Sequence, residues 1–528
     1  MLTISRRTAL GLSAGAALSL ITHPRHGFAQ AGKKVFRFRP YSALRVLDPI
    51  STPAYGTRNH GYLVYDQLFG VDVNYVPRPQ MIDTWEMSSD QLTYTFRLRD
   101  GLSFHDGSPV TGEDCVASIA RWAKRDIIGL RLAKVTKAMT ALDDRSFRIE
   151  LTEPFGIMLH ALSKVSSVPL FIMPARIAAA APEQALTEVI GSGPYKWIEG
   201  EFDPGVHWAY ERNADYVPRS EPASGLAGGK VVLIDRFEVT TFPDDQTAIN
   251  ALIKGELDGI EAIGADLLTL VEGNADITAK RTFDPLAPTI RMNWAQPPFN
   301  DVWARRAVQA AVTQRDYLEA RVGDPAHFSL CPAIFGCGTP LETDAGVMDV
   351  GKPDLDKARE LLSRSTYKGE TVVLLNPSDA ESFQPLTALT HQVLTDLGMK
   401  VQIEGMDWNT FLQRRTNSGP ISEGGWNITH AVFGQLDFNS PLTNPNFDAR
   451  GTAGYTGFVD DPETEVLKTA FQRTGAEEER KAIAEQLQRR AYDLVFYIPL
   501  GNYYDYVATR SNVSYAAAPM FVGWGLDL

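Results

Sequence analysis

The spacing of hydrophobic and polar residues predicts a chain of strands and helices. Apolar and polar residues alternate in Val35-Phe36-Arg37-Phe38-Arg39 and again over 92–99, which is typical of strands with one buried face. Apolar residues recur at helical spacing over 57–69, 111–122, 245–257, 300–317, 355–362, 383–397 and 477–493. These patterns predict a protein that contains both kinds of element.

Two local signals sharpen this prediction. Thr111 precedes a helical pattern and Asp114 follows three positions later, which is the arrangement of a helix-capping box. A strand over 371–375, the helix over 383–397 and a strand over 401–404 form a β-α-β unit, which joins parallel strands through a right-handed crossover. We therefore expect an α/β fold, in which small-molecule sites lie at the carboxyl ends of strands or between lobes.

Length and composition indicate a large globular protein. The chain has 528 residues, of which 44% are hydrophobic and 22% are charged. A single hydrophobic core rarely grows beyond about 250–300 residues, so we expect two or three lobes. Neither a collagen-like nor a disordered composition fits.

The N-terminus resembles an export signal of the twin-arginine type. Arg6-Arg7 precedes an apolar stretch over 8–21, and Ala29-Gln30-Ala31 offers a cleavage site, so we expect a signal over 1–31. An ordinary Sec signal that carries two arginines is the alternative. The apolar stretch is shorter than the roughly 20 residues of a membrane helix. No cysteine stands at the cleavage site, so we expect a soluble protein in the periplasm of a Gram-negative cell.

The net charge argues against nucleic acid as a partner. The formal charge is −13, and removal of residues 1–31 takes away three arginines and no acid, which leaves −16. Nucleic-acid binding needs a basic surface. Net charge does not identify a ligand, because it acts on solubility and long-range steering.

The three cysteines have different expected roles. Export permits a disulfide, and Pro332 and Gly336 could turn the short loop between Cys331 and Cys337, so we expect these two to be bridged. Two separately buried thiols are the alternative. Cys115 lies in a helical pattern and is expected to be a buried thiol.

Motifs for catalysis or metal binding are weak. A Gly-x-Ser-x-Gly pattern occurs only at 11–15, inside the expected signal. The histidines that follow the signal are scattered, and no two stand at the i, i+4 spacing of a helical zinc pair. No phosphate-binding loop of the nucleotide hydrolases is present. We therefore expect no enzyme activity, no metal and no cofactor.

Several longer motifs resemble one known family, the extracellular solute-binding proteins of the dipeptide, oligopeptide and nickel type (bacterial solute-binding protein family 5). The most specific match is Tyr94-Thr95-Phe96-Arg97-Leu98-Arg99-Asp100-Gly101 followed by Phe104-His105-Asp106-Gly107-Ser108-Pro109-Val110-Thr111-Gly112-Glu113-Asp114. Further matches are Leu47-Asp48-Pro49, Val64-Tyr65-Asp66-Gln67-Leu68, Gly191-Ser192-Gly193-Pro194-Tyr195, Phe299-Asn300-Asp301 and Tyr497-Ile498-Pro499-Leu500. The resemblance covers nearly all of the chain after the signal.

The resemblance implies a two-lobe periplasmic-binding-protein fold (class II, cluster C type) with a hinge and an extra domain inserted in the first lobe. By this resemblance the first lobe gathers 32–65, 191–285 and 494–528, the inserted domain spans 66–190, and the second lobe spans 286–493. The hinge strands would lie near 285 and 493.

The resemblance also implies a function. The chain would act as a monomer that binds a peptide, an opine-like compound, a sugar or another organic solute between its lobes. It would deliver this ligand to an inner-membrane ABC permease with its ATPase, through closure of the lobes. The implied ligand-binding positions are Tyr41, Ser42, Asn293, Trp294, Trp426, Phe433 and Asp437, although either tryptophan could belong to the core.

Asp437 bears on the ligand class. Peptide-binding relatives carry two aspartates in this segment, and a carboxylate there receives the peptide's ammonium. This chain reads Phe433-Gly434-Gln435-Leu436-Asp437 and keeps one aspartate. Asp437 could pair with an ammonium or could cap a turn. Two other functions stay open at this point: a periplasmic hydrolase, and a binding module that serves a sensor or client protein instead of a permease.

Overall fold

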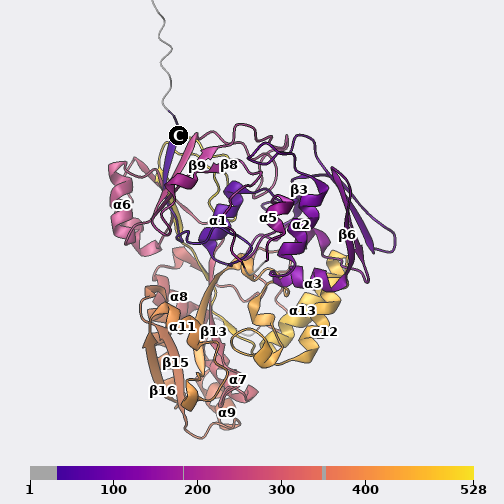
Figure 1. Ribbon diagram of the computed structural model, residues 1–528. Helices are drawn as coiled ribbons and strands as arrows, with labels where there is room; N and C mark the ends of the chain where they lie inside the picture. Colours follow the sequence, from indigo (N-terminus) through magenta and orange to yellow (C-terminus); the bar gives the residue numbers. More distant parts are fainter. Residues whose placement is uncertain (1–32, 182–183, 348–351) are drawn as a thin grey trace, which may run out of the picture. The chain divides into compact units, whose positions relative to one another are not determined.

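The computed structural model describes residues 33–181, 184–347 and 352–528 (Figure 1). The expected export signal lies outside the described residues. Residues 34–528 form one unit. No helix in the described part of the chain has the length and hydropathy of a membrane span.

A first sheet of seven strands forms the core of one lobe. Its order is β12 (Ile277–Arg281), β20 (Tyr506–Arg510), β11 (Gly259–Ile263), β1 (Val35–Arg39), β10 (Arg236–Thr240), β9 (His207–Arg212) and β8 (Tyr195–Trp197). The alternation in β1 is confirmed, because Phe36 and Phe38 are buried while Arg37 is exposed. Helices α1 (Tyr55–Val64) and α6 (Asp245–Lys254) belong to this part of the chain. Gly255 ends α6 with φ of 75°, a conformation that glycine adopts without strain.

A second sheet forms the core of the other lobe. Its order is β14 (Phe328–Ser329), β19 (Asn502–Tyr503), β13 (Leu286–Met292), β17 (Ile428–Gly434), β15 (Thr371–Pro377) and β16 (Lys400–Met406), with β18 (Ile498–Pro499) also paired to β13. β15 and β16 are parallel and α10 (Gln384–Asp396) connects them, which confirms the predicted β-α-β unit. The other helices here are α7 (Val302–Ala311), α8 (Gln314–Val322), α9 (Leu355–Ser363) and α11 (Trp408–Arg414).

A third group of elements lies within the 66–190 range. It contains an antiparallel sheet in the order β4 (Ile82–Met87), β5 (Thr93–Leu98), β7 (Ser146–Leu151), β6 (Thr136–Asp143), and a small pair of β2 (Phe69–Val71) and β3 (Pro77–Pro79). Its helices are α2 (Gly112–Trp122), α3 (Ile127–Val135), α4 (Met158–Leu162) and α5 (Ala175–Ala178). The Thr111–Asp114 capping box at the start of α2 is confirmed.

Two long helices of the second half lie beside this third group. They are α12 (Pro462–Arg473) and α13 (Glu477–Leu494), drawn in yellow next to α3 in Figure 1. Arg131 of α3 forms an ion pair with Glu465 of α12 at 3.2 Å, and Arg473 pairs with Glu153. The inserted region therefore contacts the second half of the chain directly.

Two predicted helices differ from the structure. The helix expected over 57–69 ends at Val64, because the Tyr65 backbone is extended and the Gly193 N–H donates to the Val64 carbonyl at 2.8 Å. The helix expected over 300–317 is two helices. Val312 is extended, and the Thr313 hydroxyl caps α8 by accepting from the Asp316 N–H, a capping signal that the continuous apolar pattern conceals.

The second hinge segment lies later than predicted. We expected the chain to return to the first lobe at 494, but β18 and β19 still pair with the second sheet. The return occurs between Tyr503 and Tyr506, and the first crossing lies over 282–285, between β12 and β13. Thr282 N–H donates to the Asp505 carbonyl at 2.9 Å, so the two crossing segments are hydrogen-bonded to each other. An alternating apolar and polar pattern predicts a strand but does not show which sheet the strand joins. The sequence therefore could not show that β18 and β19 belong to the second sheet.

A buried ion pair ties the start of the inserted region to the first lobe. The Lys230 ammonium contacts Asp66 at 2.7 Å and both side chains are fully buried. Tyr216 donates its hydroxyl to the other Asp66 oxygen at 3.0 Å, and Lys230 lies 4.9 Å from the Trp524 ring centre.

Lys230→Met should strongly destabilise the protein. It leaves the Asp66 carboxylate buried without its cation, which costs roughly 3–5 kcal/mol. Urea unfolding of the variant and wild type measures the loss. The double variant Asp66→Asn with Lys230→Met should lose less, because no charge is then stranded. A wild-type midpoint for the single variant would contradict this expectation.

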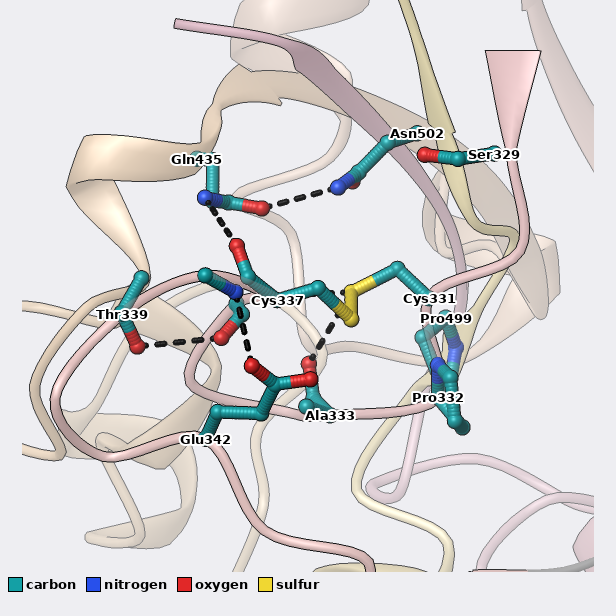
Figure 2. Close-up of a disulfide and its surroundings, with 12 residues drawn as sticks. Ser329, Cys331, Pro332, Ala333, Cys337, Thr339, Glu342, Gln435, Pro499 and Asn502 are labelled. Carbon is teal, nitrogen blue, oxygen red and sulfur yellow. Dashed lines mark hydrogen bonds between the residues drawn. A yellow bond between two sulfur atoms is a disulfide. The ribbon is translucent and has the colours of Figure 1, made fainter.

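The structure joins Cys331 and Cys337, which are six positions apart in the sequence, in a disulfide, and Cys115 is a buried free thiol. Figure 2 shows that the loop they close supports a neighbouring segment. Gln435 donates its side-chain amide to the Cys337 carbonyl at 2.9 Å and accepts from Asn502 at 2.8 Å. Gln435 begins the short 3-10 helix η6 (Gln435–Asp437), so this loop buttresses Asp437.

Replacement of both Cys331 and Cys337 by serine should lower the free energy of unfolding by about 2–3 kcal/mol, because a loop this short constrains the unfolded chain only modestly. Denaturant unfolding checks the loss. Alkylation of the unfolded, unreduced wild type should label Cys115 alone, and labelling of three thiols would show that the bridge is absent.

Candidate ligand-binding site

A cavity of about 1370 Å³ lies between the two sheets. Its walls come from the segments that follow the carboxyl ends of strands in both sheets, where α/β folds place ligands. Tyr41 follows β1, Asp266 follows β11, Phe383 follows β15, Trp408 follows β16 and Asp437 follows β17. Tyr55 of α1 and Lys164 of the inserted region also line it. The cavity is therefore lined by loops that are far apart in the sequence.

Three of the seven residues expected to contact ligand line this cavity: Tyr41, Phe433 and Asp437. Tyr41 projects into the cavity with 49% of its surface exposed, and its backbone N–H is fixed by a 2.8 Å hydrogen bond to Glu261. Phe433 ends β17 and packs 5.3 Å from Phe438. Asp437 is 8% exposed and accepts a 2.6 Å hydrogen bond from the Tyr55 hydroxyl.

The other four residues do not line the cavity. Trp426 is fully buried and donates its indole N–H to the Arg415 carbonyl at 3.0 Å. Asn293 is fully buried and donates to the Trp426 carbonyl at 2.9 Å, so both residues join chain segments within the second lobe. Trp294 packs on Phe496, and the guanidinium of Arg305 lies 3.5 Å from its ring centre. Ser42 also lies outside the cavity wall.

The hinge supplies a second acid beside Asp437 that the local sequence does not contain. Asp284 accepts a 3.1 Å hydrogen bond from the Leu436 N–H, next to Asp437 in the chain. Burial and the neighbouring Asp437 charge raise the pKa of Asp284 to about 8. Burial and Asp437 also raise the pKa of the Tyr55 hydroxyl well above its usual value, which keeps Tyr55 a hydrogen-bond donor. Asp284 and Asp437 are 153 positions apart in the sequence, so the sequence analysis could not identify them as neighbours.

Asp284 faces a smaller adjoining cavity of about 280 Å³, which shares Tyr41, Tyr55 and Asp505 with the larger one. Asp505, in the second crossing segment, has its pKa raised to about 6 by burial. Acidic groups therefore collect where the two lobes join.

The cationic residues of the cavity wall differ in what they contact. Arg39 pairs with Asp245, and Lys164 pairs with Asp126. Arg125 donates to the Ser51 carbonyl at 3.0 Å. Arg321 and Arg415 instead lie over aromatic rings, at 4.8 Å from the Tyr503 centre and 5.9 Å from the Tyr455 centre. Sequence reasoning missed all five, because neither their spacing nor their neighbours form a motif.

Among the described residues no group of three or more His, Cys, Asp or Glu side chains is arranged to hold a metal ion. The expectation of no cofactor rests on the sequence alone.

Two α/β lobes that share a solute-sized cavity at their strand ends define a bacterial solute-binding protein. The profile of the bacterial extracellular solute-binding proteins, family 5, matches residues 76–446, and the chain belongs to this family. This confirms the resemblance and the two-lobe α/β fold expected from it. The chain is the solute-binding component of an ABC importer and works in the periplasm.

Comparisons with individual proteins agree. A probable peptide ABC transporter periplasmic-binding protein of Sinorhizobium fredii is 35% identical over 507 residues, which covers 95% of this chain and 94% of that protein. A glutathione-binding protein of Pectobacterium atrosepticum is 26% identical and is covered to 74%, with 77% of this chain. An ABC transporter-associated periplasmic binding protein of Helicobacter pylori, solved with a bound peptide, has a TM-score of 0.75 at 21% identity, with 94% and 98% of the two chains covered.

Asp284→Asn should flatten the dependence of stability on pH. Between the unfolded pKa of about 3.9 and the folded value of about 8, the folded carboxyl holds a proton that the unfolded chain has released. The free energy of unfolding of the wild type should therefore fall as the pH rises through this window, by at most about 1.4 kcal/mol per pH unit for this group.

Urea midpoints at pH 5 and pH 8.5 test this, with the exposed Asp276→Asn as a control that should behave like wild type. Equal pH dependence in Asp284→Asn and wild type would show that Asp284 titrates normally.

Proposed function

We propose that the cavity binds a peptide-like solute whose ammonium group is held by Asp437. The observation that carries this proposal is the position of Asp437, which is buried in the cavity wall and oriented by the Tyr55 hydroxyl. Tyr55 belongs to the first lobe and Asp437 to the second, so this hydrogen bond already connects the lobes near the hinge. A carboxylate in such surroundings favours a cationic partner that can donate further hydrogen bonds.

The neighbouring acids also favour a ligand ammonium at this end of the cavity. Asp284 and Asp505 lie in the two crossing segments, on the same side of the cavity as Tyr41 and Tyr55. A ligand ammonium placed there would face the ionised Asp505 as well as Asp437, and the Asp284 carboxyl, which is mostly protonated at neutral pH because its pKa is about 8, would still offer a hydrogen-bond acceptor. The relatives named for peptide and glutathione binding are consistent with such a ligand.

The proposed mechanism is closure without covalent chemistry. A ligand that contacts both lobes stabilises the closed arrangement by its preference for that state, and the permease then receives the closed protein. No described residue that lines the cavity is a histidine or a cysteine, so a Ser–His or Cys–His pair cannot be assembled there. This supports a binding protein that is not an enzyme.

Export through the twin-arginine route is also part of the proposal and rests on Arg6 and Arg7 alone.

Asp437→Asn should sharply weaken binding of amine-bearing ligands. Loss of a buried charge partner costs roughly 3–5 kcal/mol, which at 1.4 kcal/mol per decade corresponds to about two to three and a half orders of magnitude in Kd. A thermal-shift screen with dipeptides, tripeptides, opine-like conjugates and sugars would select the best probe. Calorimetry would then compare its affinity for wild type, Asp437→Asn and Asp266→Asn.

Asp266 is the matched control, since it lines the same cavity on the other sheet and should matter little. Unchanged affinity in Asp437→Asn would overturn ammonium pairing. A screen in which sugars bind and peptides do not would overturn the ligand class.

A further inference from the structure

The inserted region touches the second lobe at a place that is not part of the hinge. The contact joins residues 131–156 of the inserted region to residues 465–475, which form most of α12 and the turn before α13 (Figure 1). α13 is attached to the second lobe, because Arg305 and Arg306 of α7 donate to backbone carbonyls at its end, at 3.0 and 2.8 Å. A motion of the lobes about the hinge would therefore act on this contact.

Two ion pairs cross this contact. Arg131 of α3 and Glu465 of α12 are 3.2 Å apart, and both side chains are partly buried. Arg473 at the end of α12 pairs with Glu153, and the Arg473 side chain is half exposed. Ion pairs that solvent reaches are individually weak, and salt screens them.

The backbones also come close at one point of the contact. Gly156 packs against the segment that links α12 to α13, and a Cβ atom at position 156 would lie 2.3 Å from the Thr474 carbonyl carbon and 2.5 Å from the Gly475 nitrogen. Real Cβ atoms do not approach backbone atoms so closely. A larger residue at position 156 would therefore push the inserted region away from α12.

The contact is incompletely packed. A cavity of about 190 Å³ is lined by Ile128 and Ile157 of the inserted region and by Phe471 of α12. Within the part of the chain that the structure describes, no backbone hydrogen bond joins residues 66–190 to residues 436–494, whereas the two crossing segments of the hinge are joined by one. Exposed ion pairs beside an open cavity can break and re-form without loss of a backbone ladder, so this contact can separate while the hinge stays intact.

We infer that the contact between residues 131–156 and 465–475 is a clasp, which holds the lobes closed and releases when they open. The inserted region moves with the first lobe, since the buried pairs Lys230–Asp66 and Arg121–Asp48 tie it there, and α12 moves with the second lobe. Opening about the hinge therefore breaks the two ion pairs and withdraws Gly156 from the turn. This inference rests on the closure mechanism of the proposed function.

The clasp acts on ligand affinity without contacting ligand. Its residues Arg131, Glu153, Gly156, Glu465 and Arg473 do not line the ligand cavity. A substitution among them changes only the balance between open and closed states, and a smaller closed population lowers the apparent affinity in proportion.

A steric wedge at Gly156 tests the clasp without changing any charge. Spin labels at the exposed positions Thr140→Cys in the inserted region and Gln402→Cys in the second lobe report the lobe separation of the ligand-free protein by pulsed EPR. Gly156→Ala should move the distance distribution to longer separations. Gly200→Ala is the control, because nothing lies within 4 Å of a Cβ atom there. Equal distributions in wild type, Gly156→Ala and Gly200→Ala would overturn the clasp.

Charge reversal provides an independent test with the same labels. Arg473→Glu should lengthen the separation, because Glu153 then faces an acid, and the added change Glu153→Arg should restore the wild-type distribution. A general loss of stability would not be recovered in this double variant. Arg364→Glu on α9 is the matched control, since its partner Glu360 lies in the same helix. A double variant that stays as open as Arg473→Glu would overturn the role of this ion pair in the clasp.

Calorimetry with tri-alanine connects the clasp to binding and separates it from the proposed function. Arg473→Glu should raise the Kd about threefold, the size expected for the loss of an exposed ion pair, and the double variant with Glu153→Arg should regain the wild-type Kd. A wild-type Kd in an Arg473→Glu protein with longer lobe separations would overturn the link between clasp and affinity. If tri-alanine does not bind wild type, the proposed ligand class fails, while the distance measurements on ligand-free protein still decide the clasp.

Discussion

The hydrogen bonds between the two crossing segments are the constraint on which the rest of the structure depends. Thr282 donates its backbone N–H to the Asp505 carbonyl at 2.9 Å and its hydroxyl to the same oxygen at 3.2 Å. The sheets are connected through these segments, and both sheets direct their strand ends into one cavity. Because the crossings lie side by side, the lobes share a narrow connection at which small backbone changes can produce closure.

Charge is distributed unevenly around this connection. Away from the cavity, some buried cations are neutralised by buried acids, as in Lys230–Asp66 and Arg121–Asp48, and these two pairs hold the first lobe and the inserted region together. At the cavity the compensation is incomplete. Burial raises the pKa of Asp505 to about 6, so this carboxyl is mostly ionised at neutral pH, whereas Asp284, with a pKa of about 8, is mostly protonated. Arg415 on the second lobe lies over aromatic rings. Uncompensated charge in a partly buried wall is costly to the empty protein and favourable to a ligand of opposite charge.

The sequence predicted much of the secondary structure and part of the cavity. Local signals were sufficient for α2, α6 and the β15–α10–β16 unit, since capping residues and periodicity act within a few positions. They failed at Val64 and Val312, where contacts from distant segments or a concealed cap end the helix. Trp294 and Trp426 looked suited to a ligand, but an aromatic residue near a strand end packs equally well in the core.

What the sequence by itself determined is the class of protein. Its strand and helix patterns indicated an α/β fold, and the resemblance of its motifs to family 5 over nearly the whole chain after the signal implied a two-lobe solute-binding protein. Tertiary structure alone decided the composition of the cavity wall. Asp284 and Asp437 are 153 positions apart, yet the fold brings them together, because Asp284 accepts a 3.1 Å hydrogen bond from the Leu436 N–H beside Asp437. Sequence motifs involve residues that are close along the chain, whereas electrostatic interactions depend on distance in space. Only the folded structure shows which distant residues are close enough to interact.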